Sequence, residues 1–196
     1  MKKGLVVFLV ILGILGFAAL SLAGSYNGLV RMDEQVNQAW AQVENVYQRR
    51  LDLIPNLVET VKGYAAHEKS TFVEVTQARS RAAGSISSDA INDQQKFQQF
   101  QESQAALSSA LSRLMVVVEK YPELKANENF LALQTQLEGT ENRIAVERER
   151  FNVAAQAFNI KIRQFPTNLI GGMFGFHQKE YFKADPLAKT VSKVQF

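Results

Sequence analysis

The residues that come closest to a catalytic group in this sequence surround a proline. They are Arg50, Asp52, Asn56 and Glu59 beside Pro55, and Arg79 could lie near the same surface. Two carboxylates in a cleft that separates their pKa values can perform general acid–base catalysis. A half-buried polar cluster between helices more often fixes their register and pairing. We therefore favour a structural role, with a docking surface and an enzyme that uses Asp52 and Glu59 as alternatives.

The other candidate sites lack the partners that their chemistry requires. His67 and Glu68 begin a zinc-protease signature, but no histidine follows four residues later, and the only other histidine is His177. The absence of cysteine excludes disulfides and thiolate metal ligands. The charged residues within 141–150 are typical of a salt-bridged helix surface. We therefore predict His67 on a solvated helix face, and no catalytic residue, metal site or cofactor.

The composition is that of one folded domain without a strongly charged surface. The chain has 196 residues, of which 46% are hydrophobic and 21% are charged, and this is enough for one core. The formal net charge of +3 includes Lys2 and Lys3, so the rest of the chain carries +1. We predict no nucleic-acid partner, because such partners require a strongly basic surface.

The N-terminus contains an uncharged apolar run at 4–23, with thirteen Leu, Ile, Val and Phe side chains. These side chains favour the bilayer by roughly 4 to 8 kcal/mol, and twenty helical residues span about 30 Å, the hydrocarbon thickness. We predict an uncleaved signal anchor at 1–24. A signal peptide cleaved after Ala23 is the alternative, since residues 21–23 have a small-x-small pattern.

The charges beside this run predict its orientation. Lys2 and Lys3 precede it, whereas Arg31 is balanced by Asp33 and Glu34 after it. The more positive end normally stays in the cytoplasm. We therefore predict a single-pass protein of the inner (cytoplasmic) membrane, with a cytoplasmic N-terminus and its main body outside the cytoplasm.

Heptad spacing predicts an all-α fold after the anchor. Four helices are expected: 26–51, a second from a corner at Pro55 to near residue 83, a third that ends near Tyr121 after a loop at 84–93, and 130–165. Apolar stripes support them, at Leu29, Val36 and Val43, and at Phe130, Leu137, Ile144, Phe151, Phe158 and Phe165. The third helix has one polar stripe residue, Gln104. These helices predict an elongated antiparallel up-down-up-down four-helix bundle over 25–166.

The C-terminal tail, 167–196, combines aromatic and basic residues, a composition found in segments that lie at a membrane interface. The alternative is that its aromatic side chains pack against the base of the bundle and that its end is disordered. The sequence leaves both open.

Residues 26–79 resemble the hallmark segment of the LemA family, most specifically in RRLDLIPNLVETVKGYAAHE at 49–68. Residues 121–166 and the tail sequence GFHQKEYF are similar to the second half of that family. The chain has Phe-Asn at 151–152 and at 158–159 where members typically have Tyr-Asn. The resemblance implies a membrane-anchored helical bundle but no catalytic residues or cofactor. It also suggests a link to membrane proteostasis, particularly to a membrane zinc protease.

Three functions follow as hypotheses. The first is a non-enzymatic interaction or scaffold protein of the bacterial cell envelope, with a protein partner that could be a membrane protease. The second is a membrane-organising protein that forms homo-oligomers and contacts the lipid bilayer through its tail. The third is the enzyme that would use Asp52 and Glu59.

Overall fold

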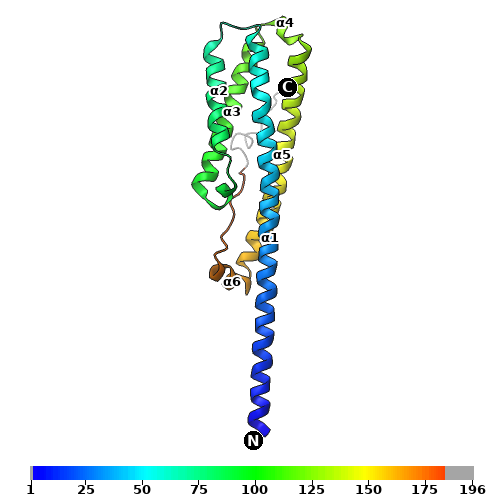
Figure 1. Ribbon diagram of the computed structural model, residues 1–196, viewed down its shortest axis with the longest axis vertical. Helices are drawn as coiled ribbons and strands as arrows, with labels where there is room; N and C mark the ends of the chain where they lie inside the picture. The colour runs from blue at the N-terminus through cyan, green and yellow to red at the C-terminus, as the bar shows by residue number, and fades with distance from the viewer. Residues whose placement is uncertain (1, 184–196) are drawn as a thin grey trace, which may run out of the picture.

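The computed structural model describes residues 2–183, which are almost entirely helical (Figure 1). Over that range the chain forms no β-strand, so the predicted all-α class is confirmed. The elements are α1 (Lys2–Lys62), α2 (Lys69–Gly84), the 3-10 helix η1 (Ser88–Asn92), α3 (Gln94–Val118), α4 (Pro122–Lys125), α5 (Glu128–Arg163) and α6 (Thr167–Phe174).

α1 is a single helix of 61 residues that includes both the apolar run and the first heptad stripe. Its N-terminal part, dark blue in Figure 1, projects alone beyond the other helices. The apolar run lies in this projecting part, and its large side chains are exposed. Within residues 2–183, α1 is the one helix that is long and apolar enough to cross a membrane.

The predicted corner at Pro55 is wrong, because α1 continues through Pro55 to Lys62 and the chain turns at 63–68. Proline lacks the N–H that would bind the carbonyl oxygen four residues earlier, which belongs to Leu51. Here the Nε of Arg79 donates to that oxygen at 2.8 Å. The second predicted helix is therefore too long, since its first turns belong to α1.

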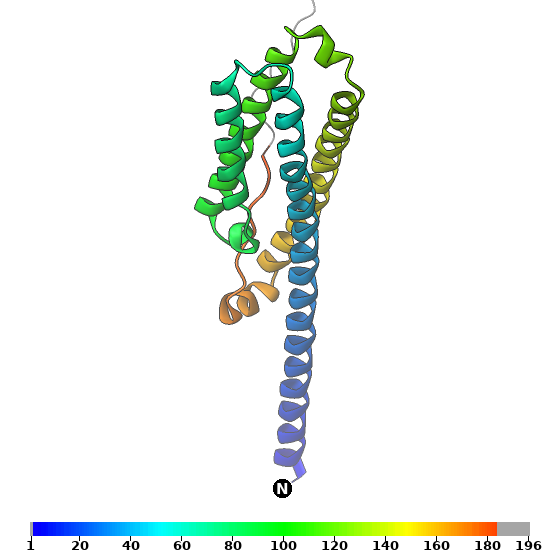
Figure 2. The same cartoon turned by 45° about the horizontal axis from the view of Figure 1, so that its top comes forward.

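The longer helices α1, α2, α3 and α5 all lie roughly along the long axis of the molecule (Figures 1 and 2). α1 packs chiefly against α5, while α2 packs chiefly against α3. The turn after α1 and the short α4 meet at the end farthest from the projecting segment, where the Asn127 side chain donates to the Tyr64 hydroxyl at 2.9 Å. We call this end the distal tip.

The buried side chains form two clusters. The distal cluster joins α1, α2, α3 and the start of α5 through aliphatic side chains such as Leu51, Leu107 and Leu114. The cluster closer to the projecting segment is aromatic: Trp40 lies 5.3 Å, between ring centroids, from both Phe100 and Phe151. Buried side chains of α1 and of α3 thus contribute to both clusters.

The α5 stripe is buried from Phe130 to Phe158, as predicted, but Phe165 is 81% exposed. α5 ends at Arg163, so Phe165 lies outside the helix and no longer follows its seven-residue period. The predicted loop at 84–93 is also not irregular throughout, because it contains η1 with Ile91 fully buried.

The described part of the tail folds back on the helices. After α6 the segment 175–183 returns alongside the bundle (Figure 1) and buries Phe182 in the aromatic cluster. Packing on the bundle, one of the two alternatives for the tail, therefore applies to this segment. Residues 184–196, with Lys189 and Lys193, lie outside the described residues.

Candidate functional site

The structure does not bring the predicted cluster around Pro55 together as a reactive site. Asp52 and Glu59 are both exposed, so neither carboxylate is enclosed in a cleft. Asp52 accepts a hydrogen bond from the Gln48 amide at 2.8 Å, and Glu59 pairs with Lys62 at 2.6 Å. These are local contacts on the surface of one helix, which contribute little to stability.

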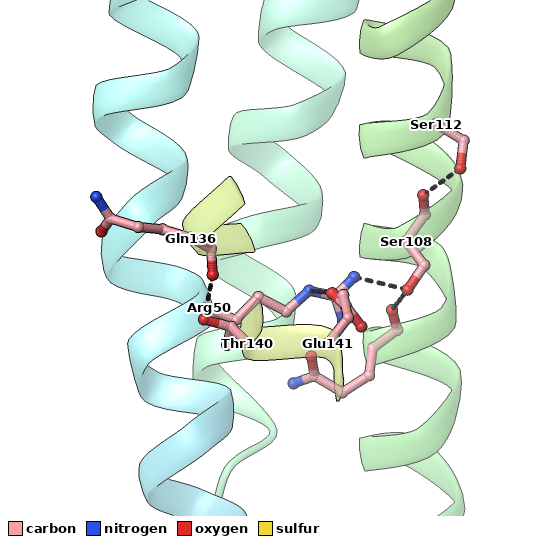
Figure 3. A network of polar contacts seen from close by, with 7 residues as sticks. Arg50, Ser108, Ser112, Gln136, Thr140 and Glu141 are labelled. Carbon is pink, nitrogen blue, oxygen red and sulfur yellow. Dashed lines mark hydrogen bonds and ion pairs between the residues drawn. The ribbon is translucent and has the colours of Figure 1, made fainter. Parts of the chain in front are cut away.

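Arg50, in contrast, is only 3% exposed and joins three helices (Figure 3). Its Nη2 donates to the Ser108 hydroxyl of α3 at 2.7 Å, and its Nε lies 2.8 Å from a carboxylate oxygen of Glu141 on α5. The Nε–H is not directed at that oxygen, so this contact is an ion pair without a hydrogen bond. The arrangement fixes the register of α1, α3 and α5.

Burial lowers the pKa of Arg50, and the neighbouring charges of Glu141 and Tyr47 oppose this shift. Burial also raises the pKa of the Tyr47 hydroxyl, against the opposing charges of Arg148 and Arg50. Arginine keeps its proton at any physiological pH. Neither group can therefore exchange a proton near neutral pH, and the cluster is a structural one.

A second polar site holds the tail through two asparagines of α5. The Asn159 side chain accepts from the backbone N–H of Lys179 at 2.8 Å and donates to its carbonyl at 2.9 Å. Asn152 makes the same pair of bonds to Phe182, each at 2.9 Å. This role was not predicted from the sequence, although the Phe-Asn pair that repeats after seven residues was a visible signal of it. Each side-chain amide therefore forms the same pair of hydrogen bonds with the tail backbone that a neighbouring β-strand would form.

Side chains of the tail complete the attachment. The Lys179 Nζ lies 2.7 Å from both the Asp33 carboxylate of α1 and the Asn92 side-chain oxygen of η1. The Phe182 ring lies 5.0 Å from Phe97, between centroids, and the Arg148 guanidinium stacks over it at 4.4 Å. One tail segment therefore cross-links α1, η1, α3 and α5.

Neither histidine is among the residues that form these polar sites. His67 is exposed, as predicted, but it lies in the turn between α1 and α2 rather than on a helix face, and His177 is exposed in the tail. In the described part of the chain, no three His, Cys, Asp or Glu side chains gather closely enough to hold a metal ion. The polar clusters hold helices together, and the exposed surfaces are left as candidates for interaction.

Known proteins resemble the chain over most of its length. A model of the LemA family matches residues 39–196. The chain is 30% identical to Magnetosome protein MamQ 2 of Paramagnetospirillum magneticum, over 92% of the chain and 72% of that protein. It is 28% identical to Magnetosome protein MamQ of Magnetospirillum gryphiswaldense, over 97% and 77%. It is 25% identical to Protein LemA of Metamycoplasma hominis, over 93% and 78%.

Proposed function

This chain belongs to the LemA family, and from that membership we propose that it is a membrane-anchored interaction or scaffold protein of the bacterial cell envelope, without enzymatic activity. The observation that carries the proposal is the continuity of α1, which joins the membrane segment to the bundle without a flexible linker. A continuous helix transmits a fixed position and direction to whatever binds the bundle, and this suits a scaffold.

The bundle acts as a spacer in this proposal. We propose that 25–166 is an up-down-up-down four-helix bundle and that the apolar run is a signal anchor in the inner membrane, with the bundle outside the cytoplasm. The part of α1 beyond the anchor, 25–62, is about 57 Å long at 1.5 Å per residue. The distal tip would therefore meet a partner protein well away from the bilayer, with a membrane protease as one candidate.

Photocrosslinking in intact cells of the native host tests the adaptor role. A photoreactive residue replaces Ala66 or Glu123, both exposed at the distal tip, and Gln156, exposed on the side of α5, is the matched control. The proposal expects the same protein to be captured from both tip positions and not from position 156. Crosslinks only to lipid or to a second copy would contradict an adaptor.

Self-association at the membrane is the second candidate function. The side chains of Leu169, Met173 and Phe174 on α6, which are apolar and exposed, favour it over catalysis. The exposure of Asp52 and Glu59 gives the enzyme hypothesis no support. Mass photometry of the full chain in lipid nanodiscs of increasing size would distinguish the two remaining candidates. A scaffold that acts as a monomer stays single at every size, whereas a self-associating protein forms defined oligomers.

A further inference from the structure

α6 has an apolar face that the bundle does not cover. Leu169 is 58% exposed, Met173 81% and Phe174 60%, and Leu169 and Met173 lie one turn apart. The opposite face, with Ile170 and Gly171, is buried against the bundle. A helix packed on a water-exposed bundle normally turns polar residues outward. The exposed part of α6 carries one polar side chain, Asn168, beside these three large apolar ones, so most of its outer surface is suited to an apolar environment.

The position of this face is set by the fold. A Cβ added at Gly171 would lie 2.7 Å from the Ile162 side chain, so the glycine allows α6 to approach α5 closely. Gly175 then ends the helix with a φ of +75°, in the left-handed region that favours glycine. α6 is therefore held against the bundle at a defined place.

α6 lies beside the part of α1 that directly follows the apolar run. The Phe174 ring lies 4.7 Å from the Tyr26 ring, between centroids. Tyr26 follows Ala23, the last residue of the run, by three residues, or about 5 Å of helix. Figures 1 and 2 both show α6 beside α1, at the end of the packed helices nearest the projecting segment.

We infer that α6 lies in the interface of the same bilayer that α1 crosses, with Leu169, Met173 and Phe174 among the lipid headgroups and upper acyl chains. Tyr26 is one of the residue types that line membrane interfaces, and Phe and Leu are typical of the apolar face of a helix that lies in one. α6 itself carries no charged side chain, so its attraction to the bilayer comes from apolar burial. The inference rests on the proposed anchoring by α1. It adds a second attachment point that fixes the tilt of the bundle on the membrane.

Site-directed spin labelling tests this in the full chain, which has no natural cysteine. The variant Met173→Cys carries a nitroxide in vesicles of phosphatidylethanolamine and phosphatidylglycerol. Power saturation compares collisions with oxygen, which concentrates in lipid, and with a water-soluble nickel chelate. Leu12→Cys, within the apolar run, reports anchoring. Val116→Cys, on an exposed apolar residue at the distal end of α3, is the matched control for water.

The expected result is that labels at positions 12 and 173 both favour oxygen, whereas the label at 116 favours the nickel chelate. A label at 173 that behaves like the label at 116, while position 12 stays in lipid, overturns the inference and leaves the anchoring intact. Nickel access at position 12 would overturn both. A label at 173 could instead be shielded from both reagents and show spin–spin broadening that disappears on dilution with unlabelled protein. That result would overturn the inference, because it would mean that a second copy of the chain covers α6 in place of lipid.

A second variant checks the apolar cause. Leu169→Glu, added to the Met173→Cys chain, places a charge on the outer face of α6, and we expect the label to shift from oxygen to nickel access. Val153→Glu, a charge added at an exposed valine of α5, should leave the label in lipid. Since both sites are exposed, circular dichroism should show the same helix content in each variant. An equal response of the label to both charges would contradict insertion of α6.

Discussion

The Nε of Arg79, on α2, donates a hydrogen bond to the backbone carbonyl oxygen of Leu51, on α1, at 2.8 Å. This is the carbonyl that Pro55 leaves without its helical partner. A side chain 28 residues away thus supplies the donor that the proline removes. α1 can therefore continue past Pro55 for two more turns, and the turn to α2 forms at 63–68.

The first prediction is that Arg79→Met destabilises the chain by about 1 to 3 kcal/mol, because it leaves the Leu51 carbonyl without a donor. In a Pro55→Ala background the alanine N–H binds that carbonyl, so the same substitution should cost clearly less. Urea unfolding of the detergent-solubilised chain measures both costs. Equal costs in the two backgrounds would show that Arg79 acts elsewhere.

The second prediction concerns the ion pair between Arg50 and Glu141. Glu141→Gln leaves the buried guanidinium without a countercharge. The expected cost in the free energy of unfolding is about 1 to 2 kcal/mol, less than for a fully buried pair, because the Glu141 carboxylate is half-exposed and solvent screens its charge. Arg50→Met removes the buried charge and keeps most of the side-chain volume, so it should cost less than Glu141→Gln. The two unfolding free energies are compared at pH 7. The reverse order would mean that the ion pair stabilises the fold beyond the cost of burying Arg50.

The third prediction is a pH dependence from Glu44. Burial raises the pKa of Glu44, and a hydrogen bond from Trp40 Nε1 at 3.0 Å partly opposes this shift. A carboxyl whose pKa is raised on folding binds its proton more tightly in the folded state, so stability falls as pH rises through that pKa. Glu44→Gln should therefore raise Tm at pH 7, and the gain should vanish below the ordinary pKa of 4.5.

Thermal unfolding at pH 7 and pH 4 measures this difference. Glu34→Gln, which changes an exposed carboxylate on the same helix, is the matched control. A gain from Glu44→Gln that is the same at both pH values would exclude ionisation as its cause.

The fourth prediction is that Asn159→Asp releases the tail. A carboxylate cannot donate to the Lys179 carbonyl, so one of the two hydrogen bonds is replaced by repulsion between oxygens. The cost should be about 1 to 3 kcal/mol, since the site is buried. Hydrogen exchange should accelerate at 179–183 and remain unchanged in α2. Asn142→Asp, at an exposed position of the same helix, should leave the tail protected.

The fifth prediction compares two phenylalanines with the same heptad spacing. Phe151→Ala should cost about 3 to 5 kcal/mol, because the ring is fully buried beside Trp40. Phe165→Ala should leave the free energy of unfolding nearly unchanged, because that ring is exposed. Equal losses in urea unfolding would mean that position 165 is buried as the stripe first suggested.

The helices were largely predictable because their signals are local. The apolar run became part of a helix, and the stripe of Leu29, Val36 and Val43 and the first five residues of the α5 stripe are buried as expected. An apolar period of seven residues depends only on helix geometry, so the buried face can be read without knowledge of the partner helix. The same period misled at Phe165, where the helix had already ended.

The candidate site was less predictable, because it depends on contacts between distant segments. From the sequence, Arg50 and Asp52 were predicted to lie in one cluster. The two residues lie on different sides of α1, so Arg50 is buried and Asp52 is exposed. The two asparagines could be seen to repeat, yet nothing nearby in the chain indicated that they bind the backbone of residues 179 and 182. A side-chain amide can form hydrogen bonds with any backbone segment within reach, so the sequence alone does not identify the segment that the two asparagines bind.

The amino-acid sequence by itself thus determined the all-α class, the apolar N-terminal helix and most of the buried stripes, because each follows from the apolar spacing of a short stretch. Only the tertiary structure decided where α1 ends, which residues hold the tail and that α6 lies beside Tyr26. These depend on donors, acceptors and surfaces brought together from separate parts of the chain. A hydrogen bond such as that from Arg79 to Leu51 exists only once α2 has packed on α1.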